Sequence, residues 1–317
     1  MRIDPNIKPK VGVSSCLMGQ SVRYDGTAKR DDYICRHLSQ YLNLNNFCPE
    51  VAIGLGIPRE TITLVGNLSN YRAIGTETID RDVTDALRNY ALSIIPALKT
   101  LSGFIVKSRS PSCGWHTVNL HSDFSQPPVP QAQGIFIAEI QRLMPELPLI
   151  DEEQLTSADE RNSFFTRIYT HAHWQQLIAQ PLTIQSILHF HRHYKYLLSV
   201  RGQQYYTELE QWLLNDSSND LKALSNSYCR RLMTILTKSV DQQRQVNTLR
   251  DLVAKQKHLN QIETTLLNAS IEQYANNHCS LVRPQNLLKS QLTTHAISDH
   301  PLHTYLTPYP SGLEPET

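Results

Sequence analysis

Short β-branched runs that end in polar, cysteine-bearing turns are the strongest constraint on the fold of this chain. The clearest runs are residues 10–15 and 103–107, and each predicts a buried strand that leaves into a loop. Apolar residues at helical spacing lie between the two runs over residues 80–99, with an interruption at Pro96, and after the second run over residues 135–140. Strands that alternate with helices predict an α/β, Rossmann-like domain with a mainly parallel sheet.

From about residue 157 the sequence changes to glycine-poor segments that are rich in Gln and Leu. Their apolar spacing predicts helices over residues 184–198, 205–213, 220–238 and 246–274. The second half is therefore expected to be mostly α-helical. Because charged residues replace the apolar pattern over residues 151–161, we predict two domains, residues 1–156 and 157–317. The tail after Pro308 is expected to be unstructured.

Composition and charge narrow the class of protein. With 30 Lys and Arg against 29 Asp and Glu, the formal net charge is +1, which argues against a surface built for a polyanion or a membrane. No apolar run approaches the roughly 18 to 20 residues that a spanning helix needs, and the first residues resemble neither a signal nor a transit peptide. We therefore expect a cytoplasmic protein whose six cysteines stay reduced, as core residues, metal ligands or nucleophiles.

Three of the cysteines, Cys16, Cys48 and Cys113, share a local context. Each follows a strand-like run and lies in a turn with small or rigid neighbours. In open α/β sheets ligands collect at loops that follow the carboxyl ends of strands, so the fold could bring these thiols together. The alternative is that each is a core residue, as free cysteines commonly are. The other cysteines lack this context: core positions are expected for Cys35 and Cys229, and Cys279 is undecided.

A site of three thiolates has a specific chemical meaning. Structural zinc sites have four protein ligands, whereas three leave one coordination position for substrate or water. A [4Fe-4S] cluster held by three cysteines likewise leaves one iron open, and such an iron has affinity for soft sulfur donors. The spacing alone does not choose between zinc and a cluster.

The motifs around these cysteines occur in the order found in a known family. They are residues 11–19 with 22–26, then residues 47–52 with 54–55 and 57–59, then residues 107–114. Together they closely resemble the thiouracil desulfidase family over roughly residues 8–150. Three separate motifs in the right order make this resemblance specific.

The resemblance implies an enzyme that cleaves a carbon–sulfur bond. It implies a [4Fe-4S] cluster held by Cys16, Cys48 and Cys113, with a small thiolated base such as 2-thiouracil as substrate. Water replaces the sulfur without net redox change, and the family's acid–base pair would correspond to Glu50 and Ser110. A carboxylate two residues from a ligand and a nearby hydroxyl agree with that chemistry.

Several other residues near the motifs have competing interpretations. Asp25 is a second candidate for a catalytic carboxylate, or a turn residue that bonds its own backbone. Glu50 could be an ordinary acid at a helix N-terminus. Lys107 and Arg109 flank a loop that could form an anion-binding nest, or they are solvated charges. His116 could be a fourth ligand, which would favour a structural zinc protein.

The second half resembles, more weakly, a YbgA-type domain of unknown role over residues 184–312, mainly through residues 189–198 and 305–310. His189 and His193 have the helical spacing of a metal-binding pair, although solvent-facing or hydrogen-bonded histidines are the more common case. A basic, aromatic surface for stacking bases is a further hypothesis, with the side chains of His191, Lys195, Arg201, Tyr194, Tyr196 and Tyr205. Aromatic residues at this spacing more often lie in a core.

These observations favour cluster-dependent desulfuration of a thiolated nucleobase. The alternatives are a structural zinc protein that uses the same cysteines, and a nucleic-acid-linked protein whose helical domain binds thiolated RNA. The sequence sets no oligomeric state.

Overall fold

The computed structural model describes residues 7–122, 128–215, 220–257, 259–292 and 301–314. The chain forms two compact units that divide between Ala172 and His173. This division lies later than the predicted one, inside a helix that begins at Ala158. Its first turns belong to the N-terminal unit because they pack on the sheet there, where Ile168 lies against Gly103.

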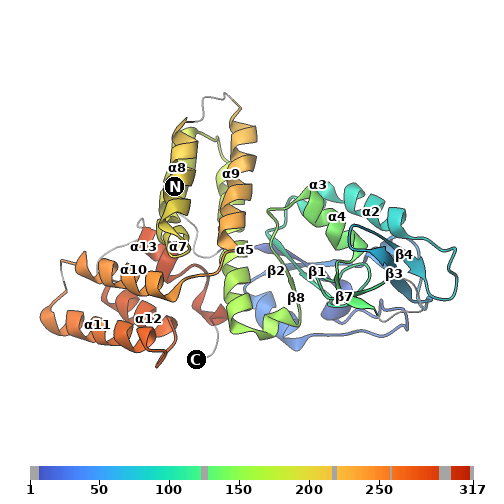
Figure 1. The fold of residues 1–317 in the computed structure, drawn as a ribbon, viewed down its shortest axis with the longest axis horizontal. Coiled ribbons are helices and arrows are strands. Elements are labelled where there is room, and N and C mark those ends of the chain that lie inside the picture. The colour runs from blue at the N-terminus through green and yellow to red at the C-terminus, as the bar shows by residue number, and fades with distance from the viewer. Residues whose placement is uncertain (1–6, 123–127, 216–219, 258, 293–300, 315–317) are drawn as a thin grey trace. The chain divides into compact units, whose positions relative to one another are not determined.

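The N-terminal unit is an α/β region, as predicted (Figure 1). Its described strands are β1 (Lys10–Ser14), β2 (Asn43–Phe47), β3 (Ile62–Asn67), β4 (Asn70–Gly75), β5 (Gly103–Val106), β6 (Val118–His121), β7 (Val129–Ala132) and β8 (Leu149–Asp151). Its helices are α1 (Pro49–Ala52), α2 (Thr84–Ser93), α3 (Ile95–Leu98), α4 (Ile135–Leu143) and the start of α5 (Ala158–Ile178). Short helical turns are η1 (Ser15–Met18), η2 (Tyr33–His37), η3 (Leu38–Gln40) and η4 (Gln154–Thr156).

The predicted parallel sheet has the strand order β2-β1-β5-β8, and each neighbouring pair is parallel. The central strands β1 and β5 are apolar and buried, whereas β2 at one edge is polar and mostly exposed. Because all four strands point the same way, their carboxyl ends meet at one edge of the sheet. That edge is where the cysteine-bearing loops begin.

Both faces of this sheet are covered by helices. Phe104 of β5 lies in a core with Phe136 of α4 and Ala91 of α2, and Figure 1 shows these helices along one side of the sheet. Successive residues of a strand face opposite sides, so Gly103 faces the other layer, where Ile168 of α5 packs. A Cβ atom at Gly12 would lie 2.5 Å from the Phe104 ring, so the tight packing requires glycine there.

A second sheet, which the sequence analysis did not predict, has the order β4-β3-β6-β7. β3 pairs antiparallel with β4 and parallel with β6, and β6 pairs antiparallel with β7. The β3–β4 hairpin turns at Asn67, whose side-chain oxygen accepts the backbone N–H groups of Ser69 and Asn70. Apolar residues of this sheet pack with Leu87 of α2 and Ile135 of α4.

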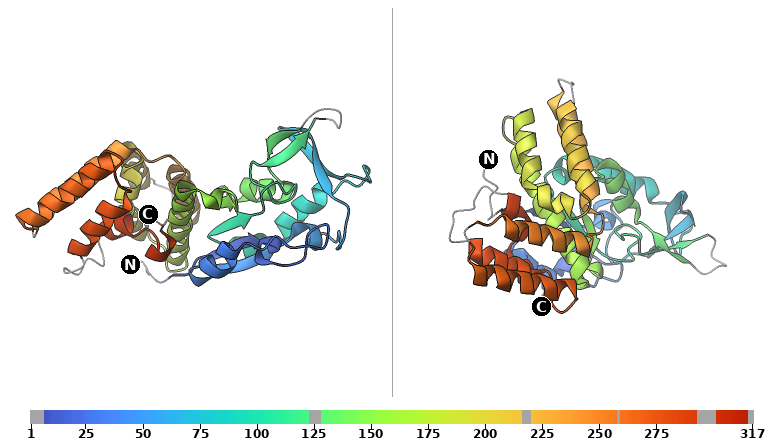
Figure 2. Two further views of the ribbon diagram at one scale, coloured as in Figure 1. Left: turned by 90° about the horizontal axis from the view of Figure 1, so that it is seen from below. Right: turned by 60° about the vertical axis from the view of Figure 1, so that its left-hand side comes forward.

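The C-terminal unit is helical, as predicted. Its described helices are the end of α5, then α6 (Ile184–His193), α7 (Lys195–Ser199), α8 (Gln203–Asn215), α9 (Leu221–Leu236), α10 (Gln242–Ala254), α11 (Gln261–Ala275), α12 (Val282–Leu292), α13 (Pro301–Leu306) and the turn η5 (Ser311–Leu313). α10, α11 and α12 pack side by side (Figure 2). No described helix is long and apolar enough to cross a membrane.

Two details of the helical half differ from the predictions. The segment expected to be one helix over residues 246–274 forms α10 and α11, because Asn260 starts a new helix with a capping box that Glu263 completes. The described part of the tail after Pro308 is ordered in the structure. Tyr309 and Leu313 are 6% and 1% exposed, so burial of these apolar side chains holds the chain in place.

Candidate active site

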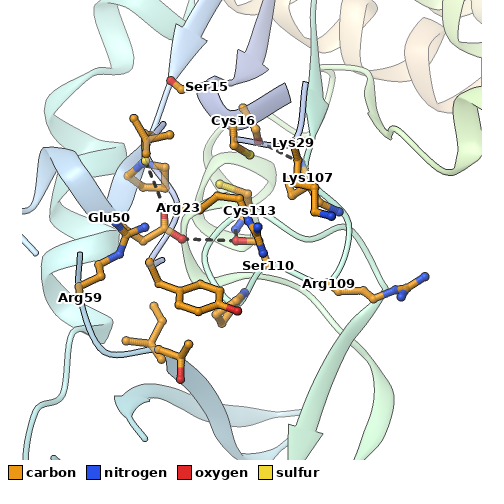
Figure 3. Close-up of a pocket in the computed structure, with 18 of the residues that line it drawn as sticks. Ser15, Cys16, Arg23, Lys29, Glu50, Arg59, Lys107, Arg109, Ser110 and Cys113 are labelled. Atoms are coloured by element: carbon orange, nitrogen blue, oxygen red, sulfur yellow. Dashed lines mark hydrogen bonds between the residues drawn. The ribbon is translucent and has the colours of Figure 1, made fainter. Parts of the chain in front are cut away.

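The three cysteines predicted to share a site line one cavity of about 340 Å³ at the carboxyl edge of the parallel sheet (Figure 3). Cys16 lies in η1 directly after β1, and Cys48 directly follows β2 and caps α1. Cys113 lies in the loop that follows β5. Parallel strands therefore deliver three thiols, far apart in sequence, to the same place.

The Cys16 turn is closed by main-chain hydrogen bonds. The carbonyl oxygen of Cys16 accepts the N–H groups of Gly19, at 3.2 Å, and Lys29, at 3.0 Å. Gly19 has φ of 83°, a conformation that glycine adopts without the steric penalty of a side chain. These contacts fix the start of the Cys16 loop against the segment that returns to the cavity at Lys29.

The Cys113 loop is docked on the beginning of α4. Ile135 N–H donates to the carbonyl of Pro111, and Phe136 N–H donates to that of Ser112. The approach is close because Gly134 has no side chain: a Cβ atom there would lie 2.3 Å from the carbonyl carbon of Ser112. The loop is thus held by helix N–H groups that would otherwise lack partners.

Glu50 connects the cysteine loops. One carboxylate oxygen lies 3.5 Å from the Cys48 thiol, and the other lies 3.4 Å from the Ser110 hydroxyl (Figure 3). The oxygen of Ser110 also accepts the N–H of Cys113 at 3.1 Å, which turns its own hydrogen toward Glu50. Glu50 is also the acidic residue in the first turn of α1. Its position therefore agrees both with a helix N-terminal acid and with a member of the predicted acid–base pair.

The protein environment keeps the three thiols protonated. Burial, and after it the negative charge of Glu50, raises the pKa of the Cys48 thiol to about 12. The same two causes raise the pKa values of the Cys16 and Cys113 thiols. If the three thiols that line the cavity were all deprotonated, a positively charged group between them would be needed to stabilise the thiolates.

The donor set fits a cluster better than a single ion. Among the described residues, no group of three or more His, Cys, Asp and Glu side chains is close enough to hold one metal ion. A cluster binds each cysteine at a different iron, so its ligands need not converge on one point. Three soft thiols around one cavity therefore match the chemistry of an iron–sulfur cluster.

An acidic pair that the sequence analysis did not single out anchors the loop after β5. Glu152, just beyond β8, accepts hydrogen bonds from the Lys107 ammonium and from the N–H and hydroxyl of Ser108. Glu153 pairs with Arg109 at 2.6 Å. The sequence signal that could have indicated this pair is a short apolar run followed by acidic residues, over residues 149–153. The strand in this run ends at the same edge of the sheet as the cysteine-bearing loops.

Five N–H groups of the loop considered as an anion-binding nest, those of Ser108, Arg109, Ser112, Cys113 and Gly114, donate to other groups of the protein. Ser108 N–H donates to Glu152, and Arg109 N–H donates to Thr117. The N–H groups further along donate to Ser110. These internal hydrogen bonds hold the loop in place.

Asp25 and His116 lie outside the set of residues that line the cavity. Asp25 accepts the N–H and hydroxyl of Thr27 and pairs with Arg23, and these hydrogen bonds lower its pKa. They are the contacts expected of a turn residue, and a catalytic role for Asp25 stays a prediction. His116 is exposed, and its ring nitrogen accepts the Gln133 side-chain amide at 3.0 Å.

Comparison with protein families identifies the two parts of the chain. Residues 11–152, which include the whole cysteine-lined cavity, match the model of the 2-thiouracil desulfurase family. The chain carries a 2-thiouracil desulfurase domain. Residues 195–310 match a family described as a protein of unknown function, DUF1722. The predicted resemblance and the order of the two domains are confirmed.

One solved structure resembles the desulfurase domain, a [4Fe-4S]-dependent thiouracil desulfidase, TudS. It is 27% identical over 47% of this chain and 94% of its own, with a TM-score of 0.39. None of the curated proteins matches the chain.

The histidines of the second domain have structural contacts. His191 is fully buried: its Nε2 donates to the carbonyl of Tyr206 at 3.1 Å, and its Nδ1 accepts the Tyr228 hydroxyl at 3.2 Å. Tyr194 is 1% exposed, so neither it nor His191 can stack on a base. The rings of His189 and His193 are 4.4 Å apart, and His193 Nδ1 donates to the His189 carbonyl. A nucleic-acid partner for this domain stays a prediction.

Proposed function

We propose that the desulfurase domain holds a [4Fe-4S] cluster through Cys16, Cys48 and Cys113 and removes sulfur from a thiolated pyrimidine base. The observation that carries this proposal is the meeting of three thiols, two buried and that of Cys48 half-buried, with the Glu50–Ser110 pair in one cavity. Family membership of residues 11–152 supports the same reaction. The net change exchanges the oxygen of water for the sulfur of the base, with hydrogen sulfide as the second product.

The chemistry divides between the cofactor and the chain. When bound, such a cluster supplies an iron without a protein ligand, which acts as a Lewis acid toward a soft sulfur donor. The chain holds it with thiols delivered by β1, β2 and the loop after β5. The Lys107 ammonium, which lines the same cavity, favours the thiolate form of Cys16.

Glu50 is placed to move the protons of the exchange. As a carboxylate it takes a proton from the water that attacks the carbon, and it returns a proton to the departing sulfur. Its two oxygens face different groups, Ser110 on one side and Cys48 on the other. One side chain therefore reaches both the ligand region and the neighbouring hydroxyl.

Ser110 orients Glu50 and the substrate. Because its oxygen already accepts the N–H of Cys113, its hydrogen is directed away from the loop, toward Glu50. Apolar side chains of Val22, Phe47 and Ile62 line the same cavity and offer a wall for a planar ring. Such a wall excludes water from one face of the base and leaves the reacting carbon near Glu50.

A structural zinc protein is the competing function. It requires a fourth ligand, and the candidate His116 is exposed and bonded to Gln133. The described residues also contain no group spaced for a single ion. The geometry favours the cluster.

The test is anaerobic purification of the full chain followed by incubation with 2-thiouracil. We expect bound iron and acid-labile sulfide in the protein, with uracil and hydrogen sulfide as products. Colourless protein that holds one equivalent of zinc and no iron would contradict the proposal. So would iron-loaded protein that leaves 2-thiouracil and related thiolated pyrimidines unchanged.

A further inference from the structure

Thr117 holds the main chain of the loop after β5, although it lies next to a strand of the second sheet. It directly precedes β6, which pairs with β3 on one side and β7 on the other. Its hydroxyl oxygen accepts the backbone N–H of Arg109 at 3.0 Å. Arg109 in turn directly precedes Ser110 of the proposed acid–base pair. Thr117 lies outside the set of residues that line the cavity, and the proposed reaction assigns it no role.

The backbone of Arg109 has a conformation that its side chain disfavours. Its φ is 59°, in the left-handed region, where the Cβ atom of an L-residue crowds the following carbonyl oxygen. Glycine adopts this conformation freely, whereas another residue keeps it only where surrounding contacts hold it. The bond from Thr117 is such a contact, and it acts on the residue from which the chain turns into Ser110.

The turn that follows Arg109 decides where the Ser110 hydroxyl lies. The carbonyl of Ser110 accepts the N–H of Gly114 at 2.7 Å, and its hydroxyl oxygen accepts that of Cys113 at 3.1 Å, so residues 110–114 form one closed turn. A change at Arg109 would therefore move this turn as a unit. The distance of 3.4 Å from Ser110 to Glu50 already exceeds the usual range of about 2.5–3.0 Å, so further displacement would break the contact.

We propose that Thr117 is a positioning residue for the acid–base pair: its hydroxyl keeps Arg109 in the left-handed conformation and thereby keeps Ser110 beside Glu50. The inference rests on the proposed function, in which Ser110 orients Glu50. Thr117 itself moves no proton at the substrate. Through this one bond the second sheet supports a site that lies at the edge of the first.

The test removes the hydroxyl and keeps the shape of the side chain. Thr117→Val replaces the hydroxyl with a methyl group and stays β-branched, as suits the start of a strand. In the anaerobic full-length protein, it should lower kcat for 2-thiouracil per bound cluster by about 10-fold and leave KM within about 2-fold, because one bond that holds the reacting geometry is lost. Thr117→Ser retains the hydroxyl and should retain most of the wild-type kcat.

The matched control is a threonine that makes the same kind of bond elsewhere in the unit. The hydroxyl of Thr84, at the start of α2, accepts the N–H of Ala73 at 2.8 Å, and Thr84 lies outside the lining of the cavity. Thr84→Val should lower the denaturant midpoint, because a buried N–H loses its partner, and should keep kcat per bound cluster. An equal fall in kcat in Thr84→Val and Thr117→Val would overturn the inference.

Two further backgrounds test the route through Arg109 and Ser110. In the Arg109→Gly background the left-handed conformation carries no steric penalty, so adding Thr117→Val should change kcat by less than about 2-fold. Adding it to Ser110→Ala should also have little effect, because the group that it positions is absent. Equal kcat values for Thr117→Val and Thr117→Ser, or the full loss in either background, would overturn the inference and leave the proposed function intact. Wild-type protein without a cluster, or without turnover of thiolated pyrimidines, would overturn both.

Discussion

The hydroxyl of Ser110 lies 3.4 Å from the carboxylate of Glu50, although 60 residues separate them in the chain. Glu50 is held in the first turn of α1 after β2, and Ser110 lies in the loop after β5. Two strands in the same parallel sheet bring their following loops to one edge. Because Ser110 also accepts the N–H of Cys113, the proposed acid–base pair and one of the proposed cluster ligands are connected by hydrogen bonds.

The first prediction concerns the ligands. Replacing Cys16, Cys48 or Cys113 by alanine should abolish bound iron, because two thiolates cannot hold the cluster at three corners. Iron and sulfide analysis of anaerobically purified protein measures this. Cys35→Ala is the control in the same unit, since Cys35 is half-buried and bonds the carbonyl of Leu17. Normal iron content in any of the three ligand variants would remove that cysteine from the site.

The second prediction separates two carboxylates. Glu50→Gln should lower kcat for 2-thiouracil by about 100-fold or more while iron content is kept, because the amide cannot accept the proton. Asp25→Asn, at the exposed turn outside the cavity, should keep kcat within a few fold of wild type. If Asp25→Asn were the slower enzyme, the assignment of the two roles would be reversed. Ser110→Ala in the Glu50→Gln background should add little, since the two residues act together.

The third prediction concerns the close contact between Gly134 and the loop that carries Cys113. Gly134→Ala would place a methyl group 2.3 Å from the backbone of Ser112, so either the loop or α4 must move. We expect a lower cluster content and a decrease in stability of about 1–3 kcal/mol, measured by denaturant unfolding. Gln133→Ala, at the preceding residue, is the control and should retain its iron. Full cluster occupancy in Gly134→Ala would show that the loop tolerates displacement.

The fourth prediction compares two adjacent acids. Glu152 accepts bonds from Lys107 and Ser108 and its side chain is 13% exposed, whereas Glu153 is 48% exposed and bonds Arg109. Glu152→Gln should destabilise the protein by about 1–3 kcal/mol, because a charged acceptor of several bonds is lost. Glu153→Gln should cost about 0–1 kcal/mol, the usual range for an exposed pair. Denaturant unfolding at constant salt measures the difference, and equal losses would contradict it.

The fifth prediction is a loss of stability in mild acid. Burial lowers the pKa of His191 from 6.5 to about 4, against the opposing bond to Tyr206 and the charge of Glu210. Above pH 6.5 the ring is neutral in both states, and as pH falls toward 4 only the unfolded chain takes up the proton. His191 should therefore cost about 2 kcal/mol of stability between about pH 7 and pH 5.

The measurement for His191 is denaturant unfolding at these two pH values. His171, in the other unit, is buried with its pKa lowered to about 4 in the same way, so it adds a similar loss. Burial also lowers the pKa values of His116 and His303, which add to the loss. His191→Gln should remove its own contribution and reduce the loss between the two pH values by about 2 kcal/mol. An unchanged pH dependence in His191→Gln would show that His191 is not buried as a neutral ring.

The location of the site could be predicted from the sequence, whereas several contacts within it could not. Each of the three cysteines, Cys16, Cys48 and Cys113, follows a strand-like run. Because the carboxyl ends of parallel strands lie at one edge of a sheet, residues that follow them lie near one another. Gly134 carries no comparable signal, because its importance comes from contact with Ser112, a residue far from it in the chain. The role of Glu152 was not predicted, because the three-residue strand before it is too short to show the alternating apolar pattern of a strand.

Local patterns in the sequence determined the α/β and helical halves, the interruption of the helix at Pro96, and the order of the motifs, because strand and helix signals depend on neighbouring residues. Only the tertiary structure decided which groups meet. Long-range packing sets the second sheet, the division inside α5 and the paired contacts of Glu50 with Cys48 and Ser110. The hydrogen bond that Ser14 of β1 accepts from the Lys107 N–H, directly after β5, depends on the same packing, which no local pattern encodes.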